Sequence, residues 1–151
     1  MRPASPLGSA RRASPTPRRL AESDVELVRE GFRAFEREGT EGLIRFLHPD
    51  FEMTTPAGLA AEPDTYRGHE GMRRYFESFY EVMDDIRFDL LELEDLGGGR
   101  VLVESVLRAR GQVTGIETEQ YVTQVWELYG GLARRVYPFA TPQEARAAFD
   151  G

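Results

Sequence analysis

Apolar residues recur at helical spacing in two segments of the chain. Residues 23–39 begin with the capping-box sequence Ser-Asp-Val-Glu and end at a glycine, and their apolar positions lie three or four residues apart. Residues 68–83 show the same periodicity. The two stripes are Val25, Val28, Phe32 and Phe35 in the first segment and Met72, Phe76, Phe79 and Met83 in the second. Both segments are predicted as amphipathic helices.

A shorter helix and a loop lie between these two segments. The stretch 40–47 begins with a threonine cap and carries three apolar residues at helical spacing. Pro49 ends this predicted helix, because proline disfavours helical geometry in the residue before it. A short strand is predicted over 51–55. Residues 56–66 contain Ala, Gly, Pro and acids without periodicity, which indicates a mobile loop and a candidate lid over a site.

The second half of the chain alternates with the two-residue period of strands. Ile86, Phe88 and Leu90 follow this alternation, but the pattern restarts at Leu91. A slip of one residue predicts a β-bulge in a curved strand.

Three further strands are predicted over 100–110, 117–129 and 132–139. Glycine turns join them into an antiparallel meander. A capping box with proline at the first helical position then begins a short helix at Thr141. Helices followed by a bent sheet predict an α+β fold.

Charge separates the first twenty residues from the rest of the chain. The net charge is −7, yet the charged side chains in 1–20 are all arginines, and the 26 acidic residues all come later. The segment 1–22 is rich in Pro, Ser, Ala and Arg, so it is predicted as a disordered basic tail before one domain at 23–151. An acidic domain repels phosphate backbones, so nucleic acid is not an expected partner.

Composition excludes several kinds of site. The 151-residue chain has no Cys and two His, so disulfides, a cysteine nucleophile and a metal site built from His or Cys are not expected. No cofactor is implied. The sequence has no apolar run of the roughly 20 residues that cross a bilayer, and no signal peptide follows the N-terminal arginines. We therefore expect a cytoplasmic protein without membrane contact.

Four motifs give the chain a family resemblance. They are LHPDFE at 47–52, YRGHEG at 66–71, VWELYGG at 125–131 and RRVYPFATPQEARAAFDG at 134–151. In this order and spacing, residues 23–151 resemble the SnoaL-like branch of the nuclear-transport-factor-2-like (NTF2-like) superfamily. The resemblance implies a conical barrel, with three N-terminal helices packed in a curved antiparallel sheet and a short C-terminal helix. The superfamily includes isomerases, cyclases, hydrolases and non-catalytic binding modules, so this fold does not fix a function.

The catalytic residues of well-known relatives are replaced at the matching positions. The position of the ketosteroid isomerase general base is Thr55, which cannot transfer a proton at neutral pH. The positions of its oxyanion hole are Phe32 and Gln124, of which only Gln124 can donate a hydrogen bond. The relay of limonene epoxide hydrolase falls on Ser105, Leu107 and Val136. No catalytic residue is therefore assigned.

Alternation and the resemblance together predict a largely apolar cavity on the concave face of the sheet. The candidate ligand-binding residues are Phe32, Thr55, Tyr75, Phe79, Ser105, Gln124, Trp126 and Arg134. Such a set suits a mostly apolar small molecule with one or two hydrogen-bonding oxygens. The alternative is that the apolar residues fill the cone. The short turn at 130–131 leaves the register of the last strand around Arg134 undetermined by one residue. A shift of one residue would reverse which of its side chains face inward.

Apolar residues on the convex face predict a homodimer, which the resemblance also implies. The expected centre of the interface is Val106, Tyr121, Val125 and Tyr137, and its charged rim is Glu104 and Arg108. The alternative is an ordinary exposed sheet face.

Two histidines and two lid acids are further candidates for chemistry. His48 and His69 lie at predicted helix ends, where a capping or turn contact is the expected role. Glu62 and Asp64 lie in the candidate lid, from which a carboxylate catalyst could reach the mouth of the cavity.

The sequence leaves two functions of different kinds. The first is a protein that binds a mostly apolar small molecule in the cone, with isomerase, cyclase or hydrolase activity left open. The second is a non-catalytic dimerisation or interaction module, favoured by the loss of the relatives' catalytic carboxylates. We prefer the first, because a glutamine inside an apolar cone needs a polar partner.

Overall fold

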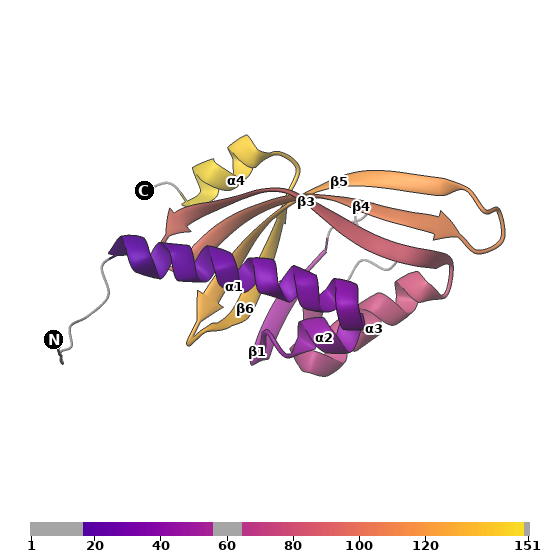
Figure 1. The fold of residues 1–151 in the computed structure, drawn as a ribbon, viewed down its shortest axis with the longest axis horizontal. Helices are drawn as coiled ribbons and strands as arrows, with labels where there is room; N and C mark the ends of the chain where they lie inside the picture. Colours follow the sequence, from indigo (N-terminus) through magenta and orange to yellow (C-terminus); the bar gives the residue numbers. More distant parts are fainter. Residues whose placement is uncertain (1–16, 56–64, 150–151) are drawn as a thin grey trace, which may run out of the picture.

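A curved sheet forms the middle of the molecule, with helices on both of its faces (Figure 1). The computed structural model describes residues 17–55 and 65–149, with side chains from residue 24 onward. The helices are α1 (Pro17–Glu38), α2 (Thr40–Ile44), α3 (Gly68–Tyr80) and α4 (Pro142–Phe149). The strands are β1 (Leu47–Thr54), β2 (Thr65–Arg67), β3 (Met83–Gly97), β4 (Arg100–Gly111), β5 (Glu117–Tyr129) and β6 (Leu132–Phe139). The predicted α+β fold is confirmed.

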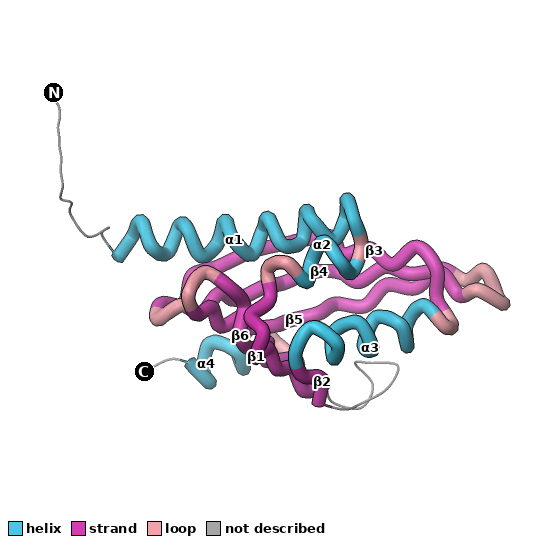
Figure 2. Tube along the Cα trace, turned by 90° about the horizontal axis from the view of Figure 1, so that it is seen from below, coloured by secondary structure: helices cyan, strands magenta, loops and turns pink. Residues whose placement is uncertain are grey.

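Six strands form one sheet in the order β2-β1-β6-β5-β4-β3. The last four strands make the predicted antiparallel meander. The sheet is not antiparallel throughout, because β1 runs parallel to β6. Helices α1 and α3 cover one face of the sheet, and α4 lies on the other (Figures 1 and 2). The space between α1, α3 and the sheet is where the main apolar core lies.

The phase slip in β3 is a β-bulge, as the sequence predicts. Leu90 and Glu92 pair with consecutive residues of β4, so Leu91 is an extra residue. Leu90 and Leu93 pack against the core on the two sides of the bulge, whereas Leu91 is exposed. The bulge therefore bends the strand while its inner face stays apolar.

Strand β6 also carries a bulge, and it determines which side chains around Arg134 face the core. Ala133 and Arg135 pair with consecutive residues of β5, so Arg134 is the extra residue. Val136 consequently faces the core, and Tyr137 faces outward. Both glycines of the preceding hairpin have positive φ, as a tight two-residue turn requires.

Helix α1 begins earlier than predicted. It starts at Pro17, so Ser23 lies within the helix and does not begin it. Proline suits the first helical position, and the Arg, Leu, Ala and Glu residues that follow favour a helix. The predicted tail 1–22 thus overlaps α1 at residues 17–22, while residues 1–16 lie outside the described part of the chain.

Three other boundaries differ from the predictions. Helix α2 ends at Ile44, and β1 already begins at Leu47, which pairs with β6. Pro49 lies where the register of β1 and β6 is broken, which is where a strand tolerates proline. Met83 begins β3 and does not belong to α3. The sequence analysis did not predict β2, which begins at the end of the candidate lid. Residues 56–64 of that lid, which include Glu62 and Asp64, lie outside the described residues.

The C-terminal helix packs on the outer face of the sheet. Thr141 Oγ1 accepts a hydrogen bond from the backbone N–H of Glu144 at 3.1 Å, which confirms the predicted cap. Ala145 is fully buried with Val125, and the rings of Tyr137 and Phe149 lie 5.3 Å apart. The chain's own helix therefore covers Val125 and Tyr137, which the sequence placed at the centre of a dimer interface.

Helices α1 and α2 pack so closely that only glycine fits at position 42. A Cβ at Gly42 would overlap the backbone carbonyl oxygen of Ala34, which cannot move aside as a flexible side chain can. Gly42→Ala is expected to lower the free energy of unfolding by about 1–3 kcal/mol. The control is Gly31→Ala in α1, where a Cβ finds its nearest neighbours at 3.7 Å. That variant gains helix propensity, up to about 1 kcal/mol. Urea denaturation measures both variants, and equal effects would contradict the close packing.

Candidate functional site

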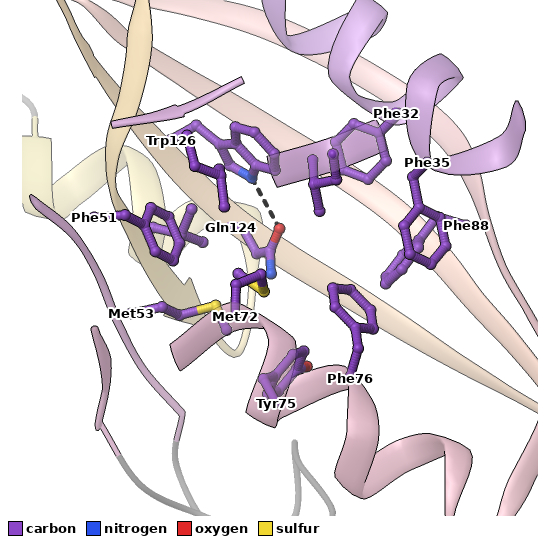
Figure 3. Close-up of a pocket in the computed structure, with 13 residues that line it drawn as sticks. Phe32, Phe35, Phe51, Met53, Met72, Tyr75, Phe76, Phe88, Gln124 and Trp126 are labelled. Carbon is purple, nitrogen blue, oxygen red and sulfur yellow. Dashed lines mark hydrogen bonds between the residues drawn. The ribbon is translucent and has the colours of Figure 1, made fainter. Parts of the chain in front are cut away.

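An apolar cavity lies between the helices and the concave face of the sheet (Figure 3). It measures about 40 Å³, within about 450 Å³ of space that includes its open mouth. The helices contribute Phe32, Phe35, Leu43, Met72, Tyr75 and Phe76. The strands contribute Leu47, Phe51, Met53, Phe88, Gln124, Trp126 and Val136. A ligand of more than a few atoms requires these side chains to shift, which methionines such as Met53 and Met72 do readily.

Phe88 joins the two sides of the cavity. Its ring on β3 meets Phe32 and Phe35 of α1 edge-to-face, with centroids 5.7 and 5.5 Å apart. It also meets Phe76 of α3 edge-to-face at 6.5 Å. Such contacts stabilise rings beyond the burial of their area. The bent sheet and both long helices are therefore connected through one aromatic side chain.

The main polar group of the cavity is the side-chain amide of Gln124, which Trp126 orients. The indole N–H of Trp126 donates a hydrogen bond to Gln124 Oε1 at 3.0 Å. An indole nitrogen can only donate, so the amide oxygen must face Trp126 and the amide nitrogen must point the other way. Figure 3 shows this nitrogen turned away from Trp126. No described residue pairs with its two N–H groups, which leaves them for a ligand that accepts hydrogen bonds.

Tyr75 supplies a second neutral polar group. Its ring meets Tyr66, Phe76 and Phe79 edge-to-face, with centroids between 5.1 and 5.2 Å apart. Burial raises the pKa of the Tyr75 hydroxyl above its ordinary value, and the neighbouring Tyr66 raises it further. The phenol is therefore neutral at physiological pH and can donate a hydrogen bond.

The structure brings together half of the residues that the sequence assigned to ligand binding. Phe32, Tyr75, Gln124 and Trp126 line the cavity. Thr55, Phe79, Ser105 and Arg134 are not among its lining residues. Thr55 lies just beyond β1, Phe79 packs behind Tyr75, and Arg134 is the extra residue of the β6 bulge. Ser105 faces the core but is covered, with 1% of its surface exposed.

Phe88, Met72 and Val136 are lining residues that the list of candidates lacked. Phe88 and Met72 belonged to predicted apolar stripes, so the sequence placed them inside without showing that they border open space. The facing of Val136 depends on the bulge at Arg134, which a sequence pattern does not reveal.

No charged side chain among the described residues lines this cavity. His48 accepts a hydrogen bond from the backbone N–H of Asp50 at 2.9 Å, which is the expected turn contact. His69 Nε2 lies 2.9 Å from the carbonyl oxygen of Leu47, so it donates its proton there. The described part of the chain contains no cluster of His, Cys, Asp and Glu that could hold a metal ion. None of its helices is long and apolar enough to span a membrane.

Comparison with known proteins identifies the family. A profile of the SnoaL-like domain matches residues 28–136, so the chain belongs to the SnoaL-like family of the NTF2-like superfamily, as its motifs predict. Among curated proteins, no significant sequence match was found.

Solved structures share the fold at low sequence identity. An NTF2-like protein of unknown function from Burkholderia pseudomallei is 22% identical, covering 85% of this chain and 98% of that one, with a TM-score of 0.69. TerC, co-crystallised with polyporic acid, is 20% identical over 85% and 99% of the two chains, with a TM-score of 0.69. A protein of ketosteroid isomerase-like fold from Catenulispora acidiphila, in complex with trimethylamine, is 12% identical over 78% and 86%, with a TM-score of 0.65.

The hydroxyl of Ser105 is buried and has no hydrogen-bond partner among the described residues. An unpaired buried hydroxyl costs about 1–3 kcal/mol, so Ser105→Ala is expected to raise the free energy of unfolding by about 1 kcal/mol. Ser78→Ala is the matched control, because the Ser78 hydroxyl donates to the carbonyl oxygen of Tyr75 at 2.7 Å. The control is expected to be neutral or destabilising in urea denaturation. A loss of stability in Ser105→Ala would mean that its hydroxyl has a partner.

Proposed function

We propose that the protein binds a neutral, mostly apolar small molecule whose oxygen accepts a hydrogen bond from Gln124. The observation that carries this proposal is the fixed orientation of the Gln124 amide, with its oxygen held by Trp126 and its nitrogen free in an apolar cavity. A free amide donor among aromatic rings favours a ligand with a ketone, ether or ester oxygen. A charged ligand group would find no opposite charge among the described lining residues.

The proposal concerns binding, and acid–base catalysis has little support from the cavity itself. Proton transfer near neutral pH needs a carboxylate, a histidine or a similar group within reach of the ligand. The described lining contains none, and the pKa of Tyr75 is raised away from neutrality. The relative of ketosteroid isomerase-like fold supports a small-molecule ligand. The described lining residues favour binding of that ligand over acid–base catalysis.

The preference for an oxygen atom is tested with two molecules of equal shape, cyclohexanone and methylidenecyclohexane. We expect both to shift the indole N–H signal of Trp126, the only tryptophan in the chain, in nuclear magnetic resonance titrations. Gln124→Leu is expected to weaken cyclohexanone binding about tenfold, the value of one hydrogen bond, and to leave methylidenecyclohexane binding unchanged. Gln143→Leu, the same change on exposed α4, is the control and should alter neither.

Two results would contradict the proposal. If neither molecule perturbs Trp126, the cavity is filled by its own side chains. If wild-type protein binds the two molecules equally well, Gln124 is not a donor to the ligand.

We also propose that two copies of the chain associate through the part of the convex face that α4 leaves open. Tyr121 is 76% exposed there. Its partner on β4, Val106, was also expected at the centre of the interface but is already buried in the single chain, with 4% of its surface exposed. Arg108 pairs with Asp89 and Glu119 next to this spot, so the face carries both signs of charge and can be complementary to itself under a two-fold axis.

Light scattering at micromolar concentration tests this association. We expect a dimer for the wild type and a monomer for Tyr121→Glu, because a buried carboxylate without a partner is costly. Tyr129→Glu is the control, since Tyr129 is similarly exposed but lies at the opposite end of β5. A monomeric wild type would show that the face is an ordinary exposed surface.

A further inference from the structure

A second cavity lies beside the first, on the other side of Gln124. It measures about 30 Å³, within about 430 Å³ of space that includes its mouth. Leu107 of β4, Val122 of β5 and Pro138 of β6 form apolar parts of its wall. Tyr121 and Thr123 of β5 add polar side chains to it. It lies where β6 ends at Phe139, which pairs with Thr123 of β5. Residues 117–122 of β5 therefore pair with no described strand on that side.

The two cavities share three lining residues, which are Tyr75, Phe88 and Gln124. Tyr75 and Phe88 are each held by ring contacts from three neighbours. Gln124 is held by one hydrogen bond, to Trp126. A small shift of the Gln124 side chain is therefore the least costly way to connect the two spaces.

We propose that the two cavities are halves of one binding site for an elongated neutral ligand. Its oxygen lies at mid-length beside Gln124, and its apolar ends fill the two halves. This inference rests on the proposed function and adds the shape of the ligand and the position of its oxygen.

The distribution of polar groups supports this arrangement. Gln124 and Tyr75, the two side chains with polar groups that both cavities share, lie between the halves. In the first half, the other described lining side chains are apolar, apart from the Trp126 N–H that Gln124 already accepts. A polar group at the ligand end that enters the first half would thus lose its hydration without compensation.

The size of the halves points the same way. Each is small for a typical ligand site, whereas the two together offer a longer path on both sides of Gln124. The first half has mostly apolar walls, and the second combines apolar side chains with Tyr121 and Thr123. A compact ligand would occupy one half only. An elongated ligand gains burial from both.

Two isomeric ketones separate these alternatives. Nonan-5-one and nonan-2-one have the same atoms, but only nonan-5-one carries its oxygen at mid-length with apolar arms on both sides. Titrations that follow the indole N–H of Trp126 are expected to show nonan-5-one binding at least about tenfold more tightly. Equal affinities, or tighter binding of nonan-2-one, would overturn the inference.

Filling the second half gives an independent test. Val122→Phe is expected to weaken nonan-5-one binding about tenfold and to leave the binding of cyclohexanone, a compact ketone that does not extend into the second half, unaffected. Val113→Phe is the matched control, because Val113 is 98% exposed between β4 and β5. Unchanged binding of nonan-5-one by a folded Val122→Phe, verified by thermal melting, would also overturn the inference. If that variant does not fold, the comparison of nonan-5-one with nonan-2-one on the wild type still tests the inference.

The outcomes distinguish this inference from the proposed function on which it rests. If cyclohexanone does not bind the wild type, the proposed function fails and the inference fails with it. If cyclohexanone binds but the two isomers bind equally, only the two-part site is wrong.

Discussion

The bend of the sheet is the constraint on which the rest of the structure depends. Strands β4 and β5 pair without any break in register, whereas the strands on either side carry extra residues. Strand β3 shifts register at three places, of which the middle one is Leu91, and β6 shifts once, at Arg134. Side chains alternate along a strand, so one extra residue reverses the facing of everything after it. Because both flanking strands make this correction, the sheet can curve around α1 and still present apolar side chains on its inner face. Without the bulges, either the curvature or the core would be lost.

The chemistry of the site follows from that inner face. The concave surface is closed by rings from both long helices, with Phe88 in contact with each. In this surrounding, a single amide has a large effect, because hydrogen bonds are stronger where water is excluded. Trp126 determines which end of the Gln124 amide faces the cavity. On the proposed function, such a site recognises one accepting oxygen and otherwise selects by shape.

Much of this could be predicted from the sequence, for physical reasons. Periodicity located the two long helices and the four-stranded meander, because burial of one face imposes a regular pattern. The phase slip in β3 was visible because Leu90 and Leu91 are adjacent apolar residues, whereas the bulge at Arg134 leaves no such mark. The start of α1 was missed because local propensity, not an apolar pattern, decides where it begins. Ser105 and Thr55 are both buried, but burial expected from a pattern does not tell a covered side chain from one that borders open space.

The central claim is that the concave face encloses an apolar cavity beside Gln124 and does not simply fill itself with side chains. A crystal structure determined under xenon pressure tests this most directly, because xenon enters dry apolar cavities and needs no hydrogen bond. Our account predicts xenon in contact with Trp126, Phe51 and Phe88. A structure in which these side chains close the space and exclude xenon would contradict it.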